Sequence, residues 1–222
     1  MIGLTVPTKV AEGAMDGKFA GSFGTLAAFS FYTSKNMTVG GDGGMVVSDD
    51  EEMISRIRIL RNQGSSDRDR YVNDVVGYNF RLNTINAAIG LLQLRDLDKW
   101  TEHRRRISKL YLEELSYLGN LIELPVGDSP GNKSAWHLFV IRLKKRDKLK
   151  EFLYSQGIET GIHYPIPVHL QKPYRKGLAT VPYNMDNTDK WAKEVLSLPI
   201  FNEITPDQAL FVANKVRNFF GK

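Results

Sequence analysis

A short apolar run, Thr25–Tyr32, places the strongest limit on how this chain can fold. Its residues Thr-Leu-Ala-Ala-Phe-Ser-Phe-Tyr are apolar at several positions on both faces of an extended chain, so both faces need cover. This pattern is typical of a strand inside a sheet rather than of an edge strand. A polar, Gly-rich stretch follows, and a second short strand is expected at Met45–Val47. The sequence therefore predicts a sheet with at least one covered strand.

Helical patterns follow these strands. Ser48 and Glu51 have the spacing of a capping box, which predicts a helix that ends at Gly64. Apolar residues at helical spacing predict one helix around Ile85–Leu92 and a longer one over Leu97–Leu118, and the boundary between two domains is expected within the longer helix. The remaining expected elements are strands at Trp136–Leu143 and Ile158–His163, and helices at Asp147–Gln156, Trp191–Leu196 and Pro206–Phe220.

The composition excludes several classes of protein. A chain of 222 residues that is 42% hydrophobic and 25% charged is expected to fold around a core rather than stay disordered. It has no cysteine, which excludes disulfide scaffolds, cysteine nucleophiles and Cys-ligated zinc, and which fits the cytoplasm. No signal peptide or apolar run of membrane-spanning length is visible. The net charge of +5 suits anionic partners, although the basic stretch His103–Arg106 is interpreted as a solvated helix face.

The densest group of residues suited to catalysis is Ser30–Asn36, followed by the glycines of Gly40–Gly44. A lysine just after a buried strand, such as Lys35, is partly desolvated, which favours the neutral, nucleophilic amine. Such an amine can form a Schiff base with an aldehyde cofactor. The hydroxyls of Ser30 and Ser34 and the backbone N–H groups of the glycines can hold a phosphate nearby. The alternative is an ordinary surface lysine in a Gly-rich loop.

Four stretches of the chain, in the same order, resemble the DegT/StrS family of sugar aminotransferases. They are Phe29–Asn36 with Gly41–Val47, Leu60–Gly64, Gly77–Ala88 and Thr160–Leu170. The resemblance covers nearly the whole chain. It implies an α/β fold, the pyridoxal-phosphate-dependent transferase fold type I, with a large domain and a small C-terminal α+β domain. Residues 1–100 would be the remainder of an incomplete large domain, and residues 101–222 the connecting helix and the small domain.

The resemblance also implies roles for individual residues. Lys35 matches the lysine that bonds to pyridoxal 5'-phosphate and moves a proton during transamination. Ser30 matches a phosphate ligand, and Asn79 a residue that reaches the cofactor phosphate of the neighbouring subunit of a homodimer. Related dehydratases carry histidine in place of this lysine, so Lys35 favours amino transfer. The implied reaction passes an amino group from a donor, expected to be glutamate, to a nucleotide-linked keto-sugar for polysaccharide biosynthesis.

A loop rich in proline, tyrosine and histidine runs from His163 to His169. Its two histidines lack the i, i+4 spacing of a helical metal pair, so no metal site is predicted. The corresponding loop of the family lies near the active site. We therefore expect His163, Tyr164 and His169 to contact the nucleotide sugar; the alternative is a rigid structural loop.

Family members extend well upstream of the first residue of this chain. Their acidic residue that pairs with the pyridine nitrogen is expected where Thr8 and Lys9 stand, just before a pair resembling Ala11-Glu12. The chain is therefore expected to be a truncated or split aminotransferase, with the N-terminal half supplied by a partner. Two alternatives stay open. One is a non-catalytic remnant that serves as an interaction subunit, and the other is a basic DNA-binding regulator, which the lack of a helix-turn-helix pattern disfavours.

Overall fold

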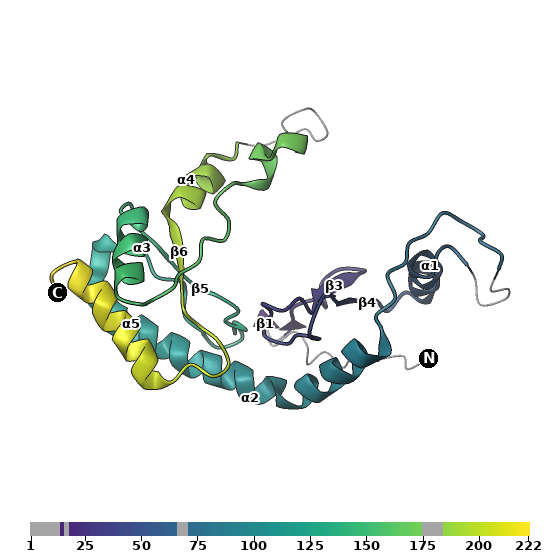
Figure 1. Cartoon of the computed structure of the whole chain (residues 1–222), viewed down its shortest axis with the longest axis horizontal. Helices are drawn as coiled ribbons and strands as arrows, with labels where there is room; N and C mark the ends of the chain where they lie inside the picture. Colours follow the sequence, from purple (N-terminus) through teal and green to yellow (C-terminus); the bar gives the residue numbers. More distant parts are fainter. Residues whose placement is uncertain (1–13, 16–17, 66–70, 175–183) are drawn as a thin grey trace. The chain divides into compact units, whose positions relative to one another are not determined.

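The computed structural model describes residues 14–15, 18–65, 71–174 and 184–222 (Figure 1). The chain divides into two compact units, and each is described by itself. The first unit comprises Met1–Glu102 with Ser129–Ala135, and the second unit comprises His103–Asp128 with Trp136–Lys222. The division falls inside one helix, α2 (Thr84–Leu115), which supplies residues to both units.

The first unit contains two short antiparallel ribbons. β1 (Ala14–Met15) pairs with β2 (Lys18–Phe19), and β3 (Ala27–Ser30) pairs with β4 (Gly44–Val47). The strand expected at Thr25–Tyr32 is present but shorter. The prediction that it lies inside a sheet is wrong for the described residues, where β3 pairs with β4 alone. Its side chains alternate between half-buried and exposed, because no described element covers its second face.

The helix α1 (Glu51–Arg61) begins two residues later than the expected capping box implies. Its N-cap is Asp50, whose carboxylate accepts a hydrogen bond from the Met53 N–H at 3.0 Å. The Ser48 hydroxyl is used elsewhere: it donates to the Thr25 carbonyl at 2.5 Å and accepts from the Asp50 N–H at 3.0 Å. Ser48 therefore joins the ends of the β3–β4 ribbon instead of capping the helix.

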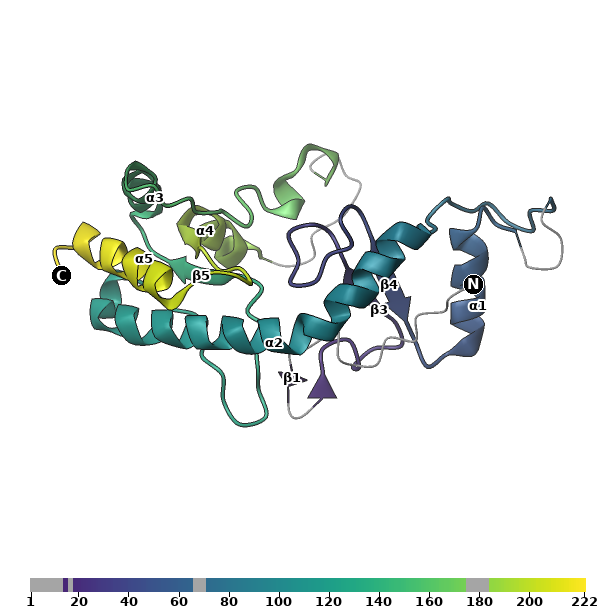
Figure 2. The same ribbon diagram turned by 60° about the horizontal axis from the view of Figure 1, so that its bottom comes forward.

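The two helices expected around Ile85–Leu92 and over Leu97–Leu118 are one continuous helix, α2 (Figure 2). The residues between them, Gln93–Asp96, contain neither glycine nor proline, so nothing in the backbone interrupts the helix. A 3₁₀ segment, η2 (Ser116–Leu121), follows directly. Gly119 within it has a φ of 49°, which only glycine adopts without strain, and helical geometry ends there as the sequence predicts.

The second unit is built on one antiparallel ribbon covered by helices (Figure 1). β5 (Phe139–Arg142) pairs with β6 (Val195–Leu198), and Phe139 lies opposite Leu198. The helices are α3 (Arg146–Ser155), α4 (Asp186–Glu194) and α5 (Pro206–Phe219), with a short 3₁₀ turn η3 (Val168–Leu170). α5 begins with a capping box between Thr205 and Gln208.

Two predictions for the second unit are wrong in detail. The helix expected at Trp191–Leu196 ends at Glu194, and the next residues form β6, because Val195–Leu198 pair with β5 and are all buried. The strand expected at Ile158–His163 is reduced to a single bridge between Gly161 and Ser197. In both cases the pairing partner is distant in the sequence, and a local pattern does not report it.

The two units differ strongly in how much apolar surface they bury. Among the described residues, the core of the second unit holds nineteen buried apolar residues, and Tyr111, Phe139 and Leu153 are among those that are fully buried. The rings of Tyr111 and Phe139 pack with their centroids 4.9 Å apart. The corresponding cluster of the first unit has four buried members: Phe31, Met37, Val39 and Leu97. Most of the hydrophobic stabilisation of the described structure therefore lies in the second unit.

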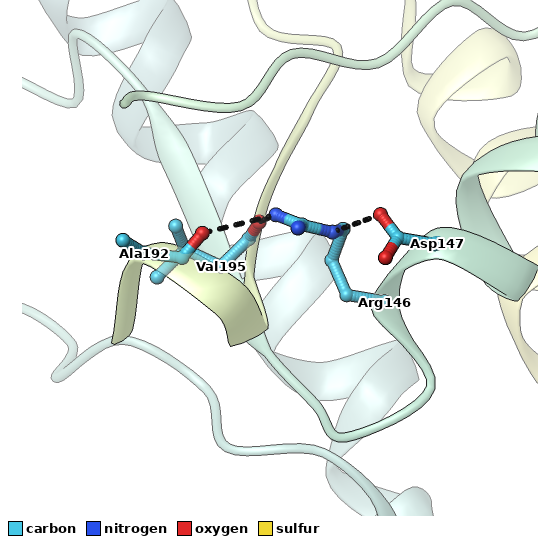
Figure 3. A network of polar contacts seen from close by, with 4 residues as sticks. All are labelled: Arg146, Asp147, Ala192 and Val195. Atoms are coloured by element: carbon cyan, nitrogen blue, oxygen red, sulfur yellow. Dashed lines mark hydrogen bonds and ion pairs between the residues drawn. The ribbon is translucent and has the colours of Figure 1, made fainter. Parts of the chain in front are cut away.

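A buried arginine fixes the junction between α4 and β6. Arg146, at the start of α3, donates from Nη1 to the Ala192 and Val195 carbonyls at 3.3 and 3.0 Å, and from Nε to the Asp147 carboxylate at 2.6 Å (Figure 3). The carbonyls at a helix C-terminus lack intrahelical partners, and a cation there also complements the helix dipole. Arg146 thus caps α4 at the point where the chain becomes a strand.

A second buried arginine, Arg104 of α2, holds the segment after β6. Its guanidinium donates to Asn202 Oδ1 at 2.9 Å, to the Trp136 carbonyl at 3.1 Å and to the Ile200 carbonyl at 3.3 Å. Burial disfavours the charged form and lowers the Arg104 pKa to about 10, although the nearby Glu203 opposes this shift. The interpretation of His103–Arg106 as a solvated face is therefore wrong at Arg104.

Leu153→Ala is expected to lower the free energy of unfolding of the second unit by about 2–5 kcal/mol, because it leaves a cavity in the large core. Tyr154→Ala, at a 73% exposed position of the same helix α3, is the matched control and should cost less than about 1 kcal/mol. Urea unfolding followed by tryptophan fluorescence measures both, since Trp136 is buried in the same core as Leu153. Equal losses in the two variants would contradict the difference in burial.

Candidate functional site

Lys35 stands in a turn that follows β3 directly. The chain leaves the strand at Ser30, buries Phe31, and then turns so that the Lys35 N–H donates to the Tyr32 carbonyl at 2.9 Å. The Lys35 side chain is half-buried. A primary amine is thus held at the end of a strand, on a turn whose backbone is fixed by hydrogen bonds.

The glycines after Lys35 allow the chain to fold back tightly on β3. The Phe31 N–H donates to the Gly43 carbonyl at 2.8 Å, and the Phe31 carbonyl accepts from the Val39 N–H at 3.2 Å. A Cβ on Gly43 would lie 2.5 Å from the Val39 side chain, and one on Gly44 would lie 2.8 Å from the Phe29 carbonyl oxygen. Only glycine fits at positions 43 and 44, where the chain packs closely against β3 and Val39. The Gly-rich stretch therefore sets the conformation of the turn that carries Lys35.

Side chains of α2 hold the same loop from the other side. Asn86 Nδ2 donates to the Val39 carbonyl at 2.6 Å, and Gln93 Oε1 accepts from the Thr38 N–H at 2.8 Å. Asn36, next to Lys35, donates to the Ala135 carbonyl at 2.7 Å. Sequence reasoning missed these positioning residues. The signal available for Asn86 was its place in the stretch Gly77–Ala88, and Gln93 carried no signal.

Ser30 is the last residue of β3, and its side chain is exposed. Its Oγ accepts a hydrogen bond from the Tyr32 N–H at 3.3 Å, which leaves the hydroxyl proton able to bond to another acceptor. The amine of Lys35 and the hydroxyl of Ser30 therefore lie five residues apart on either side of one strand end. This donor set fits a cofactor that has an aldehyde and a phosphate.

Asn79 lies in a second loop of the first unit, which packs against the end of α1. The Tyr78 N–H donates to the Leu60 carbonyl at 2.7 Å, and the Phe80 N–H donates to the Arg61 carbonyl at 3.0 Å. The rings of Tyr78 and Phe80 stack with centroids 4.9 Å apart and are 55% and 70% exposed. Asn79 is itself exposed, and the two residues that flank it in the sequence carry these stacked rings, on a backbone that is locally fixed.

His163, Tyr164 and His169 lie in the second unit, on a loop attached to α4 and β6. His163 Nδ1 is 2.9 Å from Ser197 Oγ, and His169 Nε2 is 2.9 Å from Asp189 Oδ1. Tyr164 between them is 70% exposed. A cavity of about 740 Å³ adjoins the loop; its lining residues are Pro165–Pro167, Leu170–Pro173, Asp189, Ala192 and Lys193. Each histidine thus has a partner within its own unit, and Tyr164 is exposed.

Within the described part of the chain, no cluster of three or more histidine, aspartate or glutamate side chains is suited to hold a metal ion. The same residues include no helix that is both long and apolar enough to cross a membrane. Thr8 and Lys9, which stand where an acidic residue was expected, lie outside the described residues.

Comparison with known proteins decides the family. Residues 10–217 match the family model described as the DegT/DnrJ/EryC1/StrS aminotransferase family. The chain belongs to this family. The resemblance to DegT/StrS enzymes that the sequence motifs carry is therefore confirmed.

Relatives in the DegT/DnrJ/EryC1/StrS family agree in sequence and in fold. The chain is 39% identical over 208 residues to the pleiotropic regulatory protein of Geobacillus stearothermophilus, covering 92% of this chain and 54% of that protein. It is 40% identical over 203 residues to the dTDP-3-amino-3,4,6-trideoxy-alpha-D-glucose transaminase of Streptomyces venezuelae, covering 91% and 52%. The crystal structure of S. venezuelae DesV in complex with a ketimine intermediate has a TM-score of 0.85 and 39% identity, covering 95% and 55%. The chain spans about half the length of these family members.

Gly77→Ala is expected to displace the Asn79 loop of this family member, because a Cβ at residue 77 would lie 2.0 Å from the Gly64 backbone nitrogen. Amide hydrogen exchange of the peptide 71–80 should become roughly 10-fold faster or more, as local opening becomes easier. Gly24→Ala is the matched control, because its Cβ would meet nothing closer than the Leu26 carbonyl oxygen at 3.5 Å. Unchanged exchange in Gly77→Ala would contradict the close packing of this loop.

Proposed function

We propose that this chain is the lysine-bearing part of a pyridoxal-phosphate-dependent aminotransferase that passes an amino group, from glutamate as the donor, to a nucleotide-linked keto-sugar. The observation that carries the proposal is the half-buried Lys35 in a turn held by β3, by the Gly-rich loop and by α2. Family membership supports the reaction class, and the transaminase of S. venezuelae named above supports a nucleotide sugar as substrate.

Three residues of the first unit have proposed roles in this reaction: Lys35, Ser30 and Asn79. Bound pyridoxal phosphate would supply an aldehyde and an electron-withdrawing ring. The Lys35 amine would be the group that bonds to that aldehyde. Once the amine of the amino donor has displaced it, the freed Nζ would take the proton from the carbon that bears the amino group and return it during transfer. Ser30 Oγ donates a hydrogen bond to the phosphate. Asn79 would do the same from its exposed loop, across a homodimer interface.

The second unit would supply contacts to the substrate. His163, Tyr164 and His169 remain the proposed residues of this site, but their structural settings differ. One ring nitrogen of each histidine is engaged with a partner in its own unit, whereas Tyr164 is exposed and has a hydroxyl that can donate and accept hydrogen bonds. We therefore propose Tyr164 as the residue of this loop with the most direct contact to the sugar nucleotide.

We propose that further polypeptide covers part of the first unit. Its large exposed apolar side chains include Tyr71, Val76, Tyr78, Phe80, Ile85 and Leu92. Exposed apolar surface of this extent is typical of an interface. We assign the cover to the portion of the longer family members that this chain does not match, supplied on the same or a separate polypeptide, and to a second copy in a homodimer.

A non-catalytic interaction subunit remains the second candidate, because the first unit exposes many large apolar side chains that a partner could cover. A DNA-binding regulator has less support, although one relative is named a pleiotropic regulatory protein. The basic stretch on α2 is partly used inside the second unit, since Arg104 is buried and Arg105 lies 3.5 Å from the Asp128 carboxylate. Few of its cations are therefore available for phosphates of nucleic acid.

Borohydride reduction after addition of pyridoxal phosphate is expected to attach the cofactor to Lys35, and peptide mass mapping measures where the label resides. Lys35→Ala should lose this label, because no other amine stands in the same turn. Lys99→Ala, an exposed lysine of α2 in the same unit, is the matched control and should keep it. Label spread evenly over surface lysines would contradict the assignment of Lys35 and favour the interaction subunit.

Ser30→Ala is expected to weaken the binding of pyridoxal phosphate by about 10- to 100-fold, because one hydrogen bond to a charged phosphate is lost. Absorbance titration with the cofactor measures the change. Ser22→Ala serves as the control, since the Ser22 hydroxyl donates to the Phe19 carbonyl at 2.7 Å and faces no proposed ligand. Equal affinity in Ser30→Ala and the native chain would remove Ser30 from the phosphate site.

A further inference from the structure

The loop from Gly161 to Leu170 contacts the consecutive elements α4 and β6 of the second unit at both of its ends. At its start, Gly161 and Ser197 exchange two backbone hydrogen bonds, of 3.1 and 2.8 Å. The same Ser197 contacts His163 Nδ1 through its hydroxyl at 2.9 Å. At the end of the loop, His169 Nε2 meets the Asp189 carboxylate at 2.9 Å. Two side-chain tethers, His163–Ser197 and His169–Asp189, thus bracket the loop.

The middle of the loop is exposed although its ends are held. Tyr164 is 70% exposed, and Ile166 and Val168 are 50% and 68% exposed. These side chains gain little from burial in their own unit, so the tethers do not serve to bury them. A firmly held loop that presents exposed aromatic and aliphatic groups is typical of a binding surface.

The glycine at the start of the loop sets the position of the first histidine. A Cβ on Gly161 would lie 2.5 Å from His163 Cε1 and 3.1 Å from its Nδ1. The imidazole therefore lies directly against the Gly161 backbone, with its Nδ1 at Ser197. Any side chain at residue 161 would push the ring away from this tether.

Both tethers depend on the segment that Arg146 caps. Asp189 is on α4 and Ser197 is on β6, and Arg146 binds the Ala192 and Val195 carbonyls between them (Figure 3). The two anchor points therefore keep a fixed spacing, because the junction that separates them is itself fixed. Because Asp189 and Ser197 keep a fixed spacing, the contacts that His169 and His163 make to them restrict the conformation of the loop between the two histidines.

We infer that Asp189 and Ser197 are positioning residues of the proposed transferase. They act through His169 and His163 to hold Tyr164 where it meets the nucleotide sugar. The inference rests on the proposed function for the identity of the ligand. The two tethers are contacts within the structure and hold whatever the ligand is. Neither residue would touch the substrate, which separates their role from that of Tyr164.

Hydrogen exchange and ligand affinity test this inference on the full chain loaded with pyridoxal phosphate. Asp189→Ala and Ser197→Ala should each speed amide exchange of the peptide 161–170 by about 3- to 10-fold, because each removes one tether. Gly161→Ala should have the same effect by displacing His163. Asp189→Glu keeps a carboxylate as the ion-pair partner of His169 and should restore most of the slow exchange. Calorimetry with dTDP-glucose and UDP-glucose as probes should show about 3- to 10-fold weaker binding in the alanine variants.

Matched controls separate the tethers from general effects on stability. Asp207→Ala removes an acidic residue from the first turn of α5, as Asp189→Ala does from the first turn of α4, so both lose the same favourable interaction with a helix dipole. Ser108→Ala removes a buried hydroxyl that, within the described part of the chain, has no hydrogen-bond partner. Both controls should leave the exchange of 161–170 and the affinity for the probes unchanged.

The outcomes distinguish the two proposals. Unchanged exchange in Asp189→Ala and Ser197→Ala would overturn the tethers. Faster exchange with unchanged probe affinity, or a native chain that binds neither probe, would overturn their role in positioning substrate. Failure of the proposed function itself appears separately, as loss of specific cofactor attachment at Lys35, which lies in the first unit and does not depend on this loop.

Discussion

The uninterrupted helix α2 is the element on which both units depend. Its N-terminal part supplies Asn86 and Gln93, whose side chains hold the loop behind Lys35. Its C-terminal part supplies Ile107 and Tyr111 to the large core of the second unit. A break in this helix would separate the residues that shape the lysine turn from the most stable part of the chain. The absence of glycine and proline between residues 91 and 118 therefore favours a continuous helix across the boundary of the two units.

The lysine turn is shaped by local constraints rather than by a large core. Only four apolar residues of the first unit are buried among those described, yet the turn is fixed by backbone hydrogen bonds around Phe31 and by the close approach of Gly43 and Gly44 to β3. Such constraints orient a side chain but stabilise it little against unfolding. Backbone hydrogen bonds and close packing at glycine thus set the geometry of the lysine turn. The stability of the first unit would come from burial of its exposed apolar side chains under further polypeptide.

Local signals predicted the elements better than their partners. The start of α5 at Pro206 and the end of helical geometry at Gly119 follow from capping and from glycine, which act within a few residues. The strand at Val195–Leu198 was predicted in part as helix, because its register with β5 depends on residues more than fifty positions away. Asp50 replaced Ser48 as N-cap for a similar reason, since the Ser48 hydroxyl bonds to Thr25 across the ribbon. Local sequence patterns do not show when a residue will instead bond to a partner that is distant in the sequence.

The same distinction explains what could be predicted of the candidate site. Lys35 and Ser30 lie in one continuous motif, so the sequence alone predicts them as residues that hold a cofactor, and this stays a prediction. The residues that hold the His163–His169 loop come from α4 and β6, and no pattern near the histidines identified Asp189 or Ser197. Residue type suggests that both histidines meet the substrate, and one ring nitrogen of each already has a partner in the second unit. Since a tethered imidazole restricts its neighbours, the exposed Tyr164 between them becomes the residue whose position the loop controls.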